Sequence, residues 1–400
     1  HTRLRTVNGV QTCALPIYQT VMAALSFVVI AALIAAPGLG KPVVSALTIQ
    51  NTGQGLVAGL AVVFLAILLD RATSAAATKQ QSFIPPTANQ LKARRRNLSI
   101  TGALTVIAAI ASHFATSLGN FPTKIDIATP IANVTNRFVN FLVNDISFST
   151  VAFKDLISIW VLNPIEDMLA RAPWFMTLTM FVIVALVLAG TRMAILTFVL
   201  LMAIVATGLW FDAMVTLTQT IVATMLTMIV GVLLGIWVGR SQRADAFLRP
   251  FLDAGQTMPA FVYLVPVLGL FGPTRFTAIA TGIVYSIPVV VKIVGEGIRS
   301  VPHSMIEAAT AAGSSVRQII TKVQLPAAKK AIMLSANQGM IFVLAVIVIG
   351  GFVGSGGLGY LVIMGSSKPE LAGKGLVAGL VILLLGVAID RVAQSASRRA

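Results

Sequence analysis

The stretch EAATAAGSSVRQIITKVQLP, residues 307–326, is a polar and basic segment between very hydrophobic ones. It reads Glu-Ala-Ala, three further residues, Gly313, nine further residues, and then Val-x-Leu-Pro, which places Val323, Leu325 and Pro326 at its end. A polar segment of this length, with a glycine near its middle, predicts a short helical hairpin that emerges from an apolar protein.

Local signals mark the first helix of this hairpin. Ser304-Met-Ile-Glu307 has the S-x-x-E spacing of a capping box, in which the serine side chain and the glutamate carboxylate each accept from the other's backbone N–H. Ala308 and Ala309 favour the helix and let another surface approach its backbone. Gly313 suits a left-handed stop.

The second helix has its own start signal. Ser315-Val-Arg-Gln318 repeats the capping-box spacing directly after the expected stop, and we expect Pro326 to follow the end of this helix. Two caps and a stop indicate an ordered hairpin with a function outside the bilayer.

Composition places the chain among polytopic membrane proteins. Hydrophobic residues make up 57% of the 400 residues, charged residues only 10%, and mean hydropathy is +0.91. A soluble protein of this length cannot bury so much apolar surface. The net charge of +16 lies between apolar runs, which is the positive-inside pattern and not a nucleic-acid-binding surface. The single cysteine and three scattered histidines predict no disulfide within the chain and no metal site.

Ten apolar stretches approach or reach the length that crosses a bilayer. They are 21–37, 53–70, 98–115, 174–190, 193–210, 215–238, 257–271, 276–298, 331–353 and 372–390. Basic residues concentrate in connections 71–97 and 299–330, so both are expected on the cytoplasmic side. Segment 116–173 falls on the other side, where its apolar spacing predicts interfacial amphipathic helices. The expected fold is an all-α, polytopic membrane helical bundle.

An internal repeat relates the beginning of the chain to its end. Residues 53–71, GQGLVAGLAVVFLAILLDR, match residues 373–391, GKGLVAGLVILLLGVAIDR, at ten of nineteen positions. Upstream, Gln19 to Gly40 runs parallel to Gln338 to Gly359, and both stretches end in Gly-Leu-Gly. The repeat indicates that the first eighty residues resemble the C-terminal end of an earlier copy of the same domain. The match stops before Gln19, and residues 1–17 resemble translated sequencing-adaptor sequence, so we expect them to be non-native.

The full spacing of 304–326 resembles the cytoplasmic coupling loop of ABC importer membrane subunits, where a short hairpin docks on a separate ATPase. The resemblance implies the type I importer transmembrane-domain fold in the bacterial cytoplasmic (inner) membrane. It also implies that the chain is no enzyme, has no catalytic residue, and leaves ATP to the partner subunit; the sequence contains no phosphate-loop motif. The residues that match the coupling loop are Ser304, Glu307, Ala308, Ala309, Gly313, Val323, Leu325 and Pro326.

A narrower resemblance, to the glycine betaine/proline betaine permease family, is carried by three stretches. They are DAGQTMPAFVYLVPVLGLFG (253–272), VQLPAAKKAIMLSANQGM (323–340) and GSGGLG (354–359). Members work with a cytoplasmic ABC ATPase and a periplasmic or lipid-anchored substrate-binding protein. The resemblance implies import of quaternary ammonium compatible solutes by a permease dimer or a fused pseudo-dimer embedded in membrane lipid.

The repeat and the family resemblance together predict how the chain is divided into segments. After the non-native residues 1–17, we expect a C-terminal remnant of an upstream permease copy with two transmembrane helices (18–75) and a cytoplasmic linker (76–97). N-terminal transmembrane helices with periplasmic segment 116–173 follow (98–211), and then the permease core (212–395) with coupling loop 300–330.

Prolines interrupt two core spans, and polar or aromatic residues lie near these breaks. Such breaks are tolerated in membranes where neighbours or a cavity satisfy the freed carbonyls. An aromatic pair can hold a quaternary ammonium by cation–π attraction, although ordinary packing also accounts for tyrosines there. Lys292 and Glu296, spaced i,i+4, are expected to form an internal pair or a solvated helix end. The candidate pathway residues are Gln256, Pro259, Tyr263, Tyr285 and Gln338.

Two other classes remain as alternatives. A secondary, ion-coupled transporter also uses repeats, but it usually places charged groups within its spans, and these spans contain almost none. A membrane-embedded enzyme needs a nucleophile with a base, or a metal cluster, and the sequence offers neither.

Overall fold

The computed structural model describes residues 38–80, 88–114, 126–145 and 147–399. Every regular element in these ranges is helical, which confirms the all-α prediction. Residues 1–17 and the apolar stretch 21–37 lie outside the described residues. The chain forms two compact units, residues 1–21 with 67–131 and residues 22–66 with 132–400, and each is described by itself.

In the first unit, the main described element is α4, Ala88–Phe114. The sequence KARRRN occupies its first turns, so its apolar part is confined to the second half. Asp126 lies just before the start of α6 (Ala128–Asp145). Its carboxylate accepts one hydrogen bond from the Thr129 amide at 3.0 Å and another from the Thr129 hydroxyl. These bonds favour the charged form and lower the pKa of Asp126 below its ordinary value.

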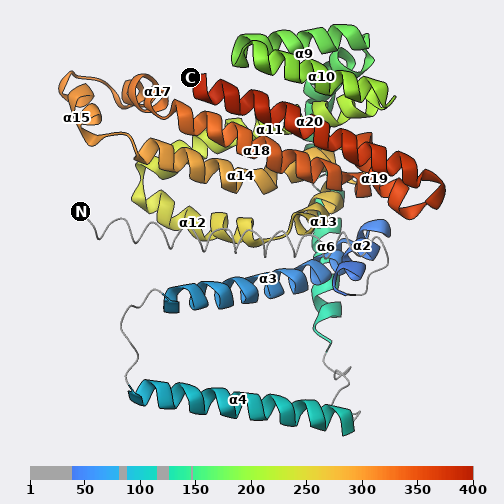
Figure 1. Cartoon of the computed structure of the whole chain (residues 1–400), viewed down its shortest axis with the longest axis vertical. Helices are drawn as coiled ribbons and strands as arrows, with labels where there is room; N and C mark the ends of the chain where they lie inside the picture. Colours follow the sequence, from blue (N-terminus) through green and yellow to red (C-terminus); the bar gives the residue numbers. More distant parts are fainter. Residues whose placement is uncertain (1–37, 81–87, 115–125, 146, 400) are drawn as a thin grey trace. The chain divides into compact units, whose positions relative to one another are not determined.

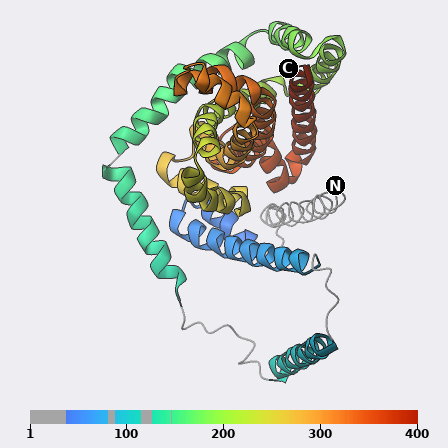
Figure 2. The same ribbon diagram turned by 90° about the vertical axis from the view of Figure 1, so that its left-hand side faces the viewer.

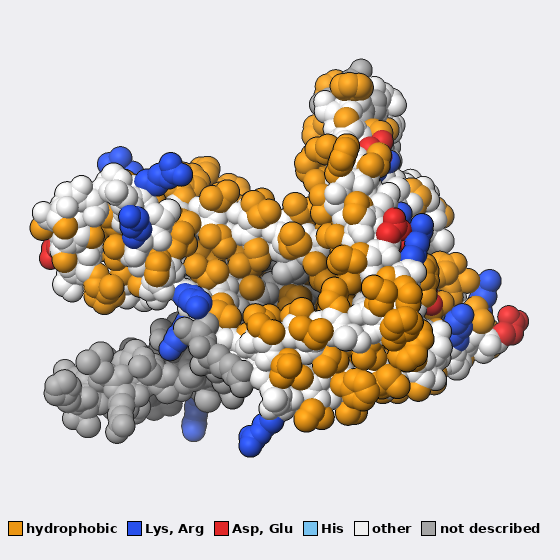
Figure 3. Space-filling model, turned by 90° about the horizontal axis from the view of Figure 1, so that it is seen from above, with side chains coloured by type: hydrophobic (Ala, Val, Ile, Leu, Met, Phe, Trp, Pro, Cys, Tyr) orange, Lys and Arg blue, Asp and Glu red, His pale blue; other side chains and the backbone are white. Residues whose placement is uncertain are grey.

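Four long helices of the second unit lie side by side (Figures 1 and 2). They are α11 (Trp210–Arg240), α14 (Arg275–Arg299), α18 (Lys329–Ile349) and α20 (Ala372–Arg399). Among the described residues, these four helices are long and apolar enough to cross a membrane, with α18 counted through Val353. Figure 3 shows apolar side chains over most of the visible face, with Lys and Arg in small groups.

Small side chains bring α11 and α14 close together. A Cβ built at Gly235 would lie 2.7 Å from the Cβ of Val294, and one at Gly231 would overlap Val290. Helix association in lipid relies on such close packing, because lipid tails are as apolar as the side chains themselves. Buried threonines such as Thr218 satisfy their hydroxyls on the carbonyl four residues earlier, so they add no unpaired polar group.

Two further candidate spans are bent. Residues 148–171 (α7, Ser147–Ile157; η2, Ser158–Leu162; α8, Asn163–Glu166; η3, Asp167–Arg171) meet α9 (Trp174–Ala189) at 105°. Likewise α12 (Gln242–Thr257) meets α13 (Ala260–Phe271) at 101°. Counting each pair once gives six spans among the described residues, fewer than the ten apolar stretches suggested. One of the ten, 21–37, lies outside the described residues. The rest of the difference arises because α10 (Thr191–Ala206) and the apolar part of α3 (Thr52–Gln80) are short, and half of α4 is polar.

Two helical hairpins complete the second unit. The first joins α2 (Gly40–Thr48) to α3, whose residues up to Ala66 belong to this unit. The second follows the 3-10 turn η5 (Gly350–Val353) and joins α19 (Gly357–Ser367) to α20 through the 3-10 turn η6 (Pro369–Leu371). Glycines 354, 356 and 357 all have positive φ, which lets the backbone reverse between α18 and α19.

Candidate coupling hairpin and pathway

Residues 303–327 form a hairpin at one end of the long helices (Figure 1). Its first helix is α15 (His303–Ala311), and its second is the continuous run of α16 (Val316–Gln318), η4 (Ile319–Gln324) and α17 (Leu325–Ala327). Gly313 lies between them with φ +75°, in the left-handed region that the sequence predicts for a stop. The hairpin is therefore continuous with α14 on one side and α18 on the other.

The expected first capping box is wrong. Pro302 is the N-cap of α15, because its extended backbone (ψ 133°) starts the helix at His303, and Ser304 lies inside the first turn without a capping bond. Glu307 instead approaches His303, with its Oε1 3.0 Å from the imidazole Nδ1. A proline that fixes its own φ and requires an extended predecessor sets the helix start two residues earlier than the serine signal suggests.

The second start signal is present in the structure. The Ser315 amide donates to Gln318 Oε1 at 2.8 Å, and the Gln318 amide donates to Ser315 Oγ at 3.4 Å. Pro326 does not follow the end of this helix but lies in its last turn, within α17. The preceding turn η4 is a π-helix, in which the Leu325 amide donates to the carbonyl of Ile320. This wider turn accommodates a proline that has no N–H to continue the ordinary ladder.

One buried layer ties the hairpin to the bundle. Ile319 and Gln324 are buried, and the Gln324 side-chain oxygen accepts from the Arg240 guanidinium at the end of α11. Most of the outer surface of the hairpin stays free: Ser304, Glu307, Ala308, Gly313 and Pro326 are exposed, and Ala309, Val323 and Leu325 are half-buried. Two apolar side chains, Met305 and Val316, are also exposed here. The hairpin thus has a fixed base and an unpartnered outer face.

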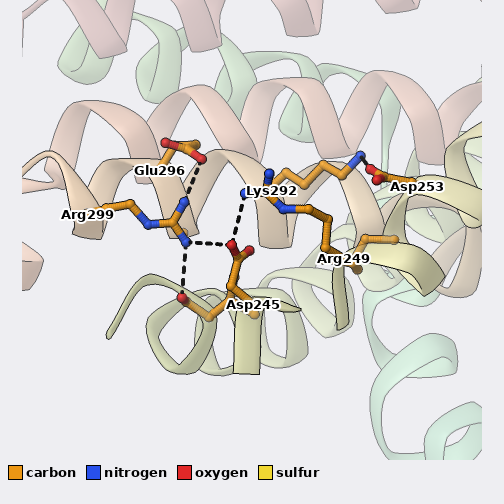
Figure 4. Close-up of a pocket in the computed structure, with 9 residues that line it drawn as sticks. Asp245, Arg249, Asp253, Lys292, Glu296 and Arg299 are labelled. Carbon is orange, nitrogen blue, oxygen red and sulfur yellow. Dashed lines mark hydrogen bonds and ion pairs between the residues drawn. The ribbon is translucent and has the colours of Figure 1, made fainter. Parts of the chain in front are cut away.

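A charged cavity of about 250 Å³ lies between α12 and α14, beside the hairpin end of the bundle (Figure 4). Arg299 contacts both Glu296 (3.0 Å) and Asp245 (3.3 Å). Asp245 also pairs with Arg249 at 2.9 Å, one turn further along α12. Carboxylates and cations alternate around the cavity, so its charges are compensated locally.

Lys292 does not pair with Glu296, contrary to one of the two expectations. Its ammonium contacts Asp253 Oδ1 and Gln256 Oε1, both at 2.5 Å, on α12. The side chain bridges two helices because α12 runs alongside α14, whereas Glu296 points toward Arg299 (Figure 4). Sequence spacing predicts neighbours on one helix and cannot predict which helix lies opposite.

The break between α12 and α13 brings the candidate pathway residues together. Pro259 is the buried N-cap of α13, and the Tyr263 hydroxyl donates to the Gly255 carbonyl at 2.6 Å across the bend. The rings of Tyr263 and Tyr285 lie 5.6 Å apart, edge to face. Tyr285 also lies 5.6 Å from Phe342 of α18, which the sequence did not single out.

The remaining pathway candidate, Gln338, lies one turn before Phe342 on the same face of α18. It is half-buried, as are Tyr263, Tyr285 and Phe342. The structure therefore places the rings of Tyr263, Tyr285 and Phe342 in contact, with Gln338 one turn from Phe342. Among the described residues, no group of three or more His, Cys, Asp or Glu side chains is placed to hold a metal ion.

Sequence reasoning missed an ion pair at the opposite end of α14. Arg275, in its first turn, contacts Glu166 at 2.5 Å and Asn163 at 3.4 Å on α8. The Glu166 side chain is 7% exposed and the Arg275 side chain 40% exposed. Their separation of 109 positions leaves no spacing rule by which the pair could be found.

Pro288, which was expected to interrupt its span, lies inside the continuous helix α14, so of the two expected proline breaks only the one at Pro259 is present. These features define a class of protein: a polytopic membrane component of a transport system, with a helix break at Pro259 in its core and a polar hairpin at one end. The chain belongs to the family described as "Binding-protein-dependent transport system inner membrane component", which matches residues 231–400. It is accordingly a multi-pass inner-membrane protein of the ABC importer permease class, not an enzyme, and the ion-coupled alternative is set aside.

Several curated relatives are similar to this chain. The glycine betaine/proline betaine permease ProW of Escherichia coli is 38% identical over 239 residues, covering 60% of this chain and 67% of ProW. The glycine betaine/carnitine permease GbuB of Listeria monocytogenes is 36% identical, covering 48% of this chain and 67% of GbuB. The trimethylamine N-oxide permease TmoV of Pelagibacter ubique is 30% identical over 94% of this chain, which spans only 53% of TmoV. The chain thus spans about half to two thirds of these relatives.

Solved structures of the MetNI methionine ABC transporter in inward-facing conformations also match. One is 21% identical, with a TM-score of 0.42, covering 47% of this chain and 95% of the matched chain. A second crystal form is 22% identical with a TM-score of 0.40.

Proposed function

We propose that this chain is the membrane-spanning subunit of an ABC importer whose transport cycle is driven by a separate ATPase docked on residues 303–327. The observation that carries this proposal is the hairpin itself, with a fixed base and a free outer face. It is continuous with α14 and α18, so displacement of the hairpin moves two packed helices together. ATP is bound by the partner subunit, and this chain supplies no nucleotide chemistry.

The proposed contact surface consists of the exposed residues of the hairpin. Ala308 offers little side-chain bulk, so another surface can approach the α15 backbone, and Met305 and Val316 offer apolar contact on either side of the turn. Glu307 contributes through its bond to His303 rather than as a cap. Val323, Leu325 and Pro326 shape the base of the second helix.

We further propose that the substrate is a quaternary ammonium solute of the glycine betaine class. The relatives' names include glycine betaine, proline betaine and carnitine, and also trimethylamine N-oxide. All are small solutes with a methylated cationic nitrogen balanced by an anionic oxygen. The rings of Tyr263, Tyr285 and Phe342 suit such a nitrogen, because each cation–π contact contributes about 0.5–2 kcal/mol.

The remaining partners follow from the same proposal. A periplasmic or lipid-anchored binding protein delivers the solute, and two permease domains, in a dimer or a fused pseudo-dimer, enclose the pathway. Residues 18–75 represent the C-terminal end of another permease copy, and the intervening linker connects it to the core domain. No nucleic acid is involved.

Reconstitution into proteoliposomes with the ATPase and binding protein tests the proposal. Uptake of labelled glycine betaine should require ATP and persist when a protonophore removes the ion gradient. Tyr285→Leu should raise the KM for uptake about three- to thirty-fold, whereas Tyr285→Phe, which keeps the ring, should change it little. Uptake that follows the ion gradient without ATP would contradict the importer, and equal KM values for the two variants would contradict the aromatic site.

A further inference from the structure

The hairpin α2–α3 is packed internally like the hairpin α19–α20, as the sequence repeat predicts. A Cβ built at Gly55 of α3 would lie 3.3 Å from the Cβ of Ala46 in α2. At the equivalent Gly375 of α20, a Cβ would lie 2.8 Å from the Cα of Gly365, which is the repeat partner of Ala46. The two hairpins therefore share this close contact at matching positions of the repeat.

The first hairpin is seated on α13 of the core domain. A Cβ at Gly55 would lie 2.8 Å from Val265 Cγ1, and one at Gly59 would lie 3.1 Å from Val262 Cγ1. Val62 is buried in the same cluster as Val265 and Phe261. The Gly-x-x-x-Gly spacing of α3 thus brings two helices into close contact, which is how helices associate in a bilayer.

The equivalent face of α20 is bare. A Cβ at Gly379, the repeat partner of Gly59, would meet no heavy atom within 4 Å among the described residues. Leu376, Leu380 and Leu383 are 78%, 52% and 60% exposed, whereas Val63, the repeat partner of Leu383, is 7% exposed. The same sequence pattern is therefore buried in one hairpin and uncovered in the other.

We propose that this face of α20, formed by Leu376, Gly379, Leu380 and Leu383, seats on helix α13 of a second copy of the core domain. The contact would repeat the one that α3 makes with α13 here. Two core domains related by a two-fold axis make each such contact twice, because an isologous interface uses the same surfaces on both partners. The inference rests on the proposed pairing of two permease domains and names the helices that form it.

A cavity of about 520 Å³ supports the two-fold relation. It is lined by α2 on one side and α19 on the other, together with the end of α13 and η5. Repeat partners face it from both hairpins: Val44 with Ile363, and Thr48 with Ser367. Equivalent residues meet around one space when a local two-fold axis passes through it.

Two helices would compete for the same surface of α13. The α3 helix of this chain and the α20 helix of a second core domain use the same seat, so only one can occupy it at a time. Unseating α3 should therefore open α13 to α20 of another copy of the chain.

Disulfide trapping in membranes tests this, in a background with Cys13→Ser. In one chain, Gly59→Cys with Val262→Cys should give an intramolecular disulfide, because the built Cβ of Gly59 lies 3.6 Å from that of Val262, within the range of disulfides. Two tagged chains, one with Gly379→Cys and the other with Val262→Cys, should cross-link poorly. Adding Gly59→Trp to the Val262→Cys chain should raise the cross-linked fraction about five-fold or more.

A control cysteine position and a milder unseating variant separate specific cross-linking from random contact and from misfolding. Leu233→Cys, an exposed position on α11, should give no cross-link to Val262→Cys in either background. Gly59→Leu serves as a milder unseating variant if the tryptophan variant does not elute as folded protein. A cross-linked fraction that does not change on unseating, or that equals the Leu233 value, overturns the proposal and assigns this face of α20 to lipid. The hairpin 303–327 is untouched, so ATPase co-purification reports the proposed function separately.

Discussion

Gly313 is the residue on which the shape of the coupling hairpin depends most. Its φ of +75° is unfavourable for any residue with a Cβ, although there is open space around it. Gly313→Ala should therefore destabilise the hairpin by about 1–2 kcal/mol through backbone strain alone. Gly313→Asn should lie between glycine and alanine, because asparagine tolerates this region better.

Amide hydrogen exchange of residues 303–327 measures this effect. Gly102→Ala, at another glycine with open space but without a positive φ, should leave stability unchanged or slightly higher. Equal protection in Gly313→Ala and in the unsubstituted protein would contradict the role of the turn.

Two serines with the same sequence signal differ in the structure. Ser315 caps the second helix, and Ser304 lies inside the first turn of α15 without a cap bond. We expect Ser315→Ala to cost about 1 kcal/mol of local stability, and Ser304→Ala to cost almost nothing. Exchange rates of the Gln318 amide and of the first-turn amides of α15 separate the two cases, and equal losses would show that the helix start is misplaced.

At the scale of elements, the ion pair between α8 and α14 should respond asymmetrically. Arg275→Met leaves the Glu166 carboxylate buried without its cation, whereas Glu166→Gln leaves a partly exposed arginine that water can solvate. We expect Arg275→Met to lower the free energy of unfolding by about 2–4 kcal/mol and Glu166→Gln by about 1 kcal/mol or less. Thermal or denaturant unfolding of both variants in detergent checks this order, and a reversed order would contradict the burial of Glu166.

Much of the element level could be predicted from sequence, because apolar stretches, prolines and glycines act locally. The long helices, the stop at Gly313, the cap at Ser315 and the break near Pro259 are all readable in this way. What could not be predicted depends on which helices lie opposite one another. Lys292 finds Asp253 rather than Glu296, and Arg275 finds Glu166 across more than one hundred positions.

Local rules also failed where two of them competed. The serine of Ser304-x-x-Glu307 has good capping spacing, but Pro302 starts the helix first. Pro326 marks a helix end in most contexts, but here the π-turn before it lets the helix continue. In both cases the backbone conformation at or before a proline sets where the helix starts or ends, and the sequence signal beside it predicts the wrong position.

For the molecule as a whole, the internal repeat bears on how two permease domains pair. One copy of its pattern is seated on α13, and the other shows an exposed apolar face. An importer that pairs two permease domains needs two coupling hairpins, and the described residues contain one. In the proposed importer, the core domain is therefore one of two paired permease domains, and each of the two hairpins receives one ATPase.

We propose that an ATPase drives this protein through the hairpin 303–327, and co-purification in detergent after co-expression with the ABC ATPase of the same source measures that contact. The unsubstituted chain should retain the ATPase in a fixed ratio. The double variant Met305→Glu with Val316→Glu, which alters only exposed apolar side chains of the hairpin, should lose it at least ten-fold, and Leu233→Ala at an exposed position of the membrane-spanning helix α11 should not. Failure of the unsubstituted chain to retain the ATPase, or equal retention by the hairpin variant, would contradict the claim.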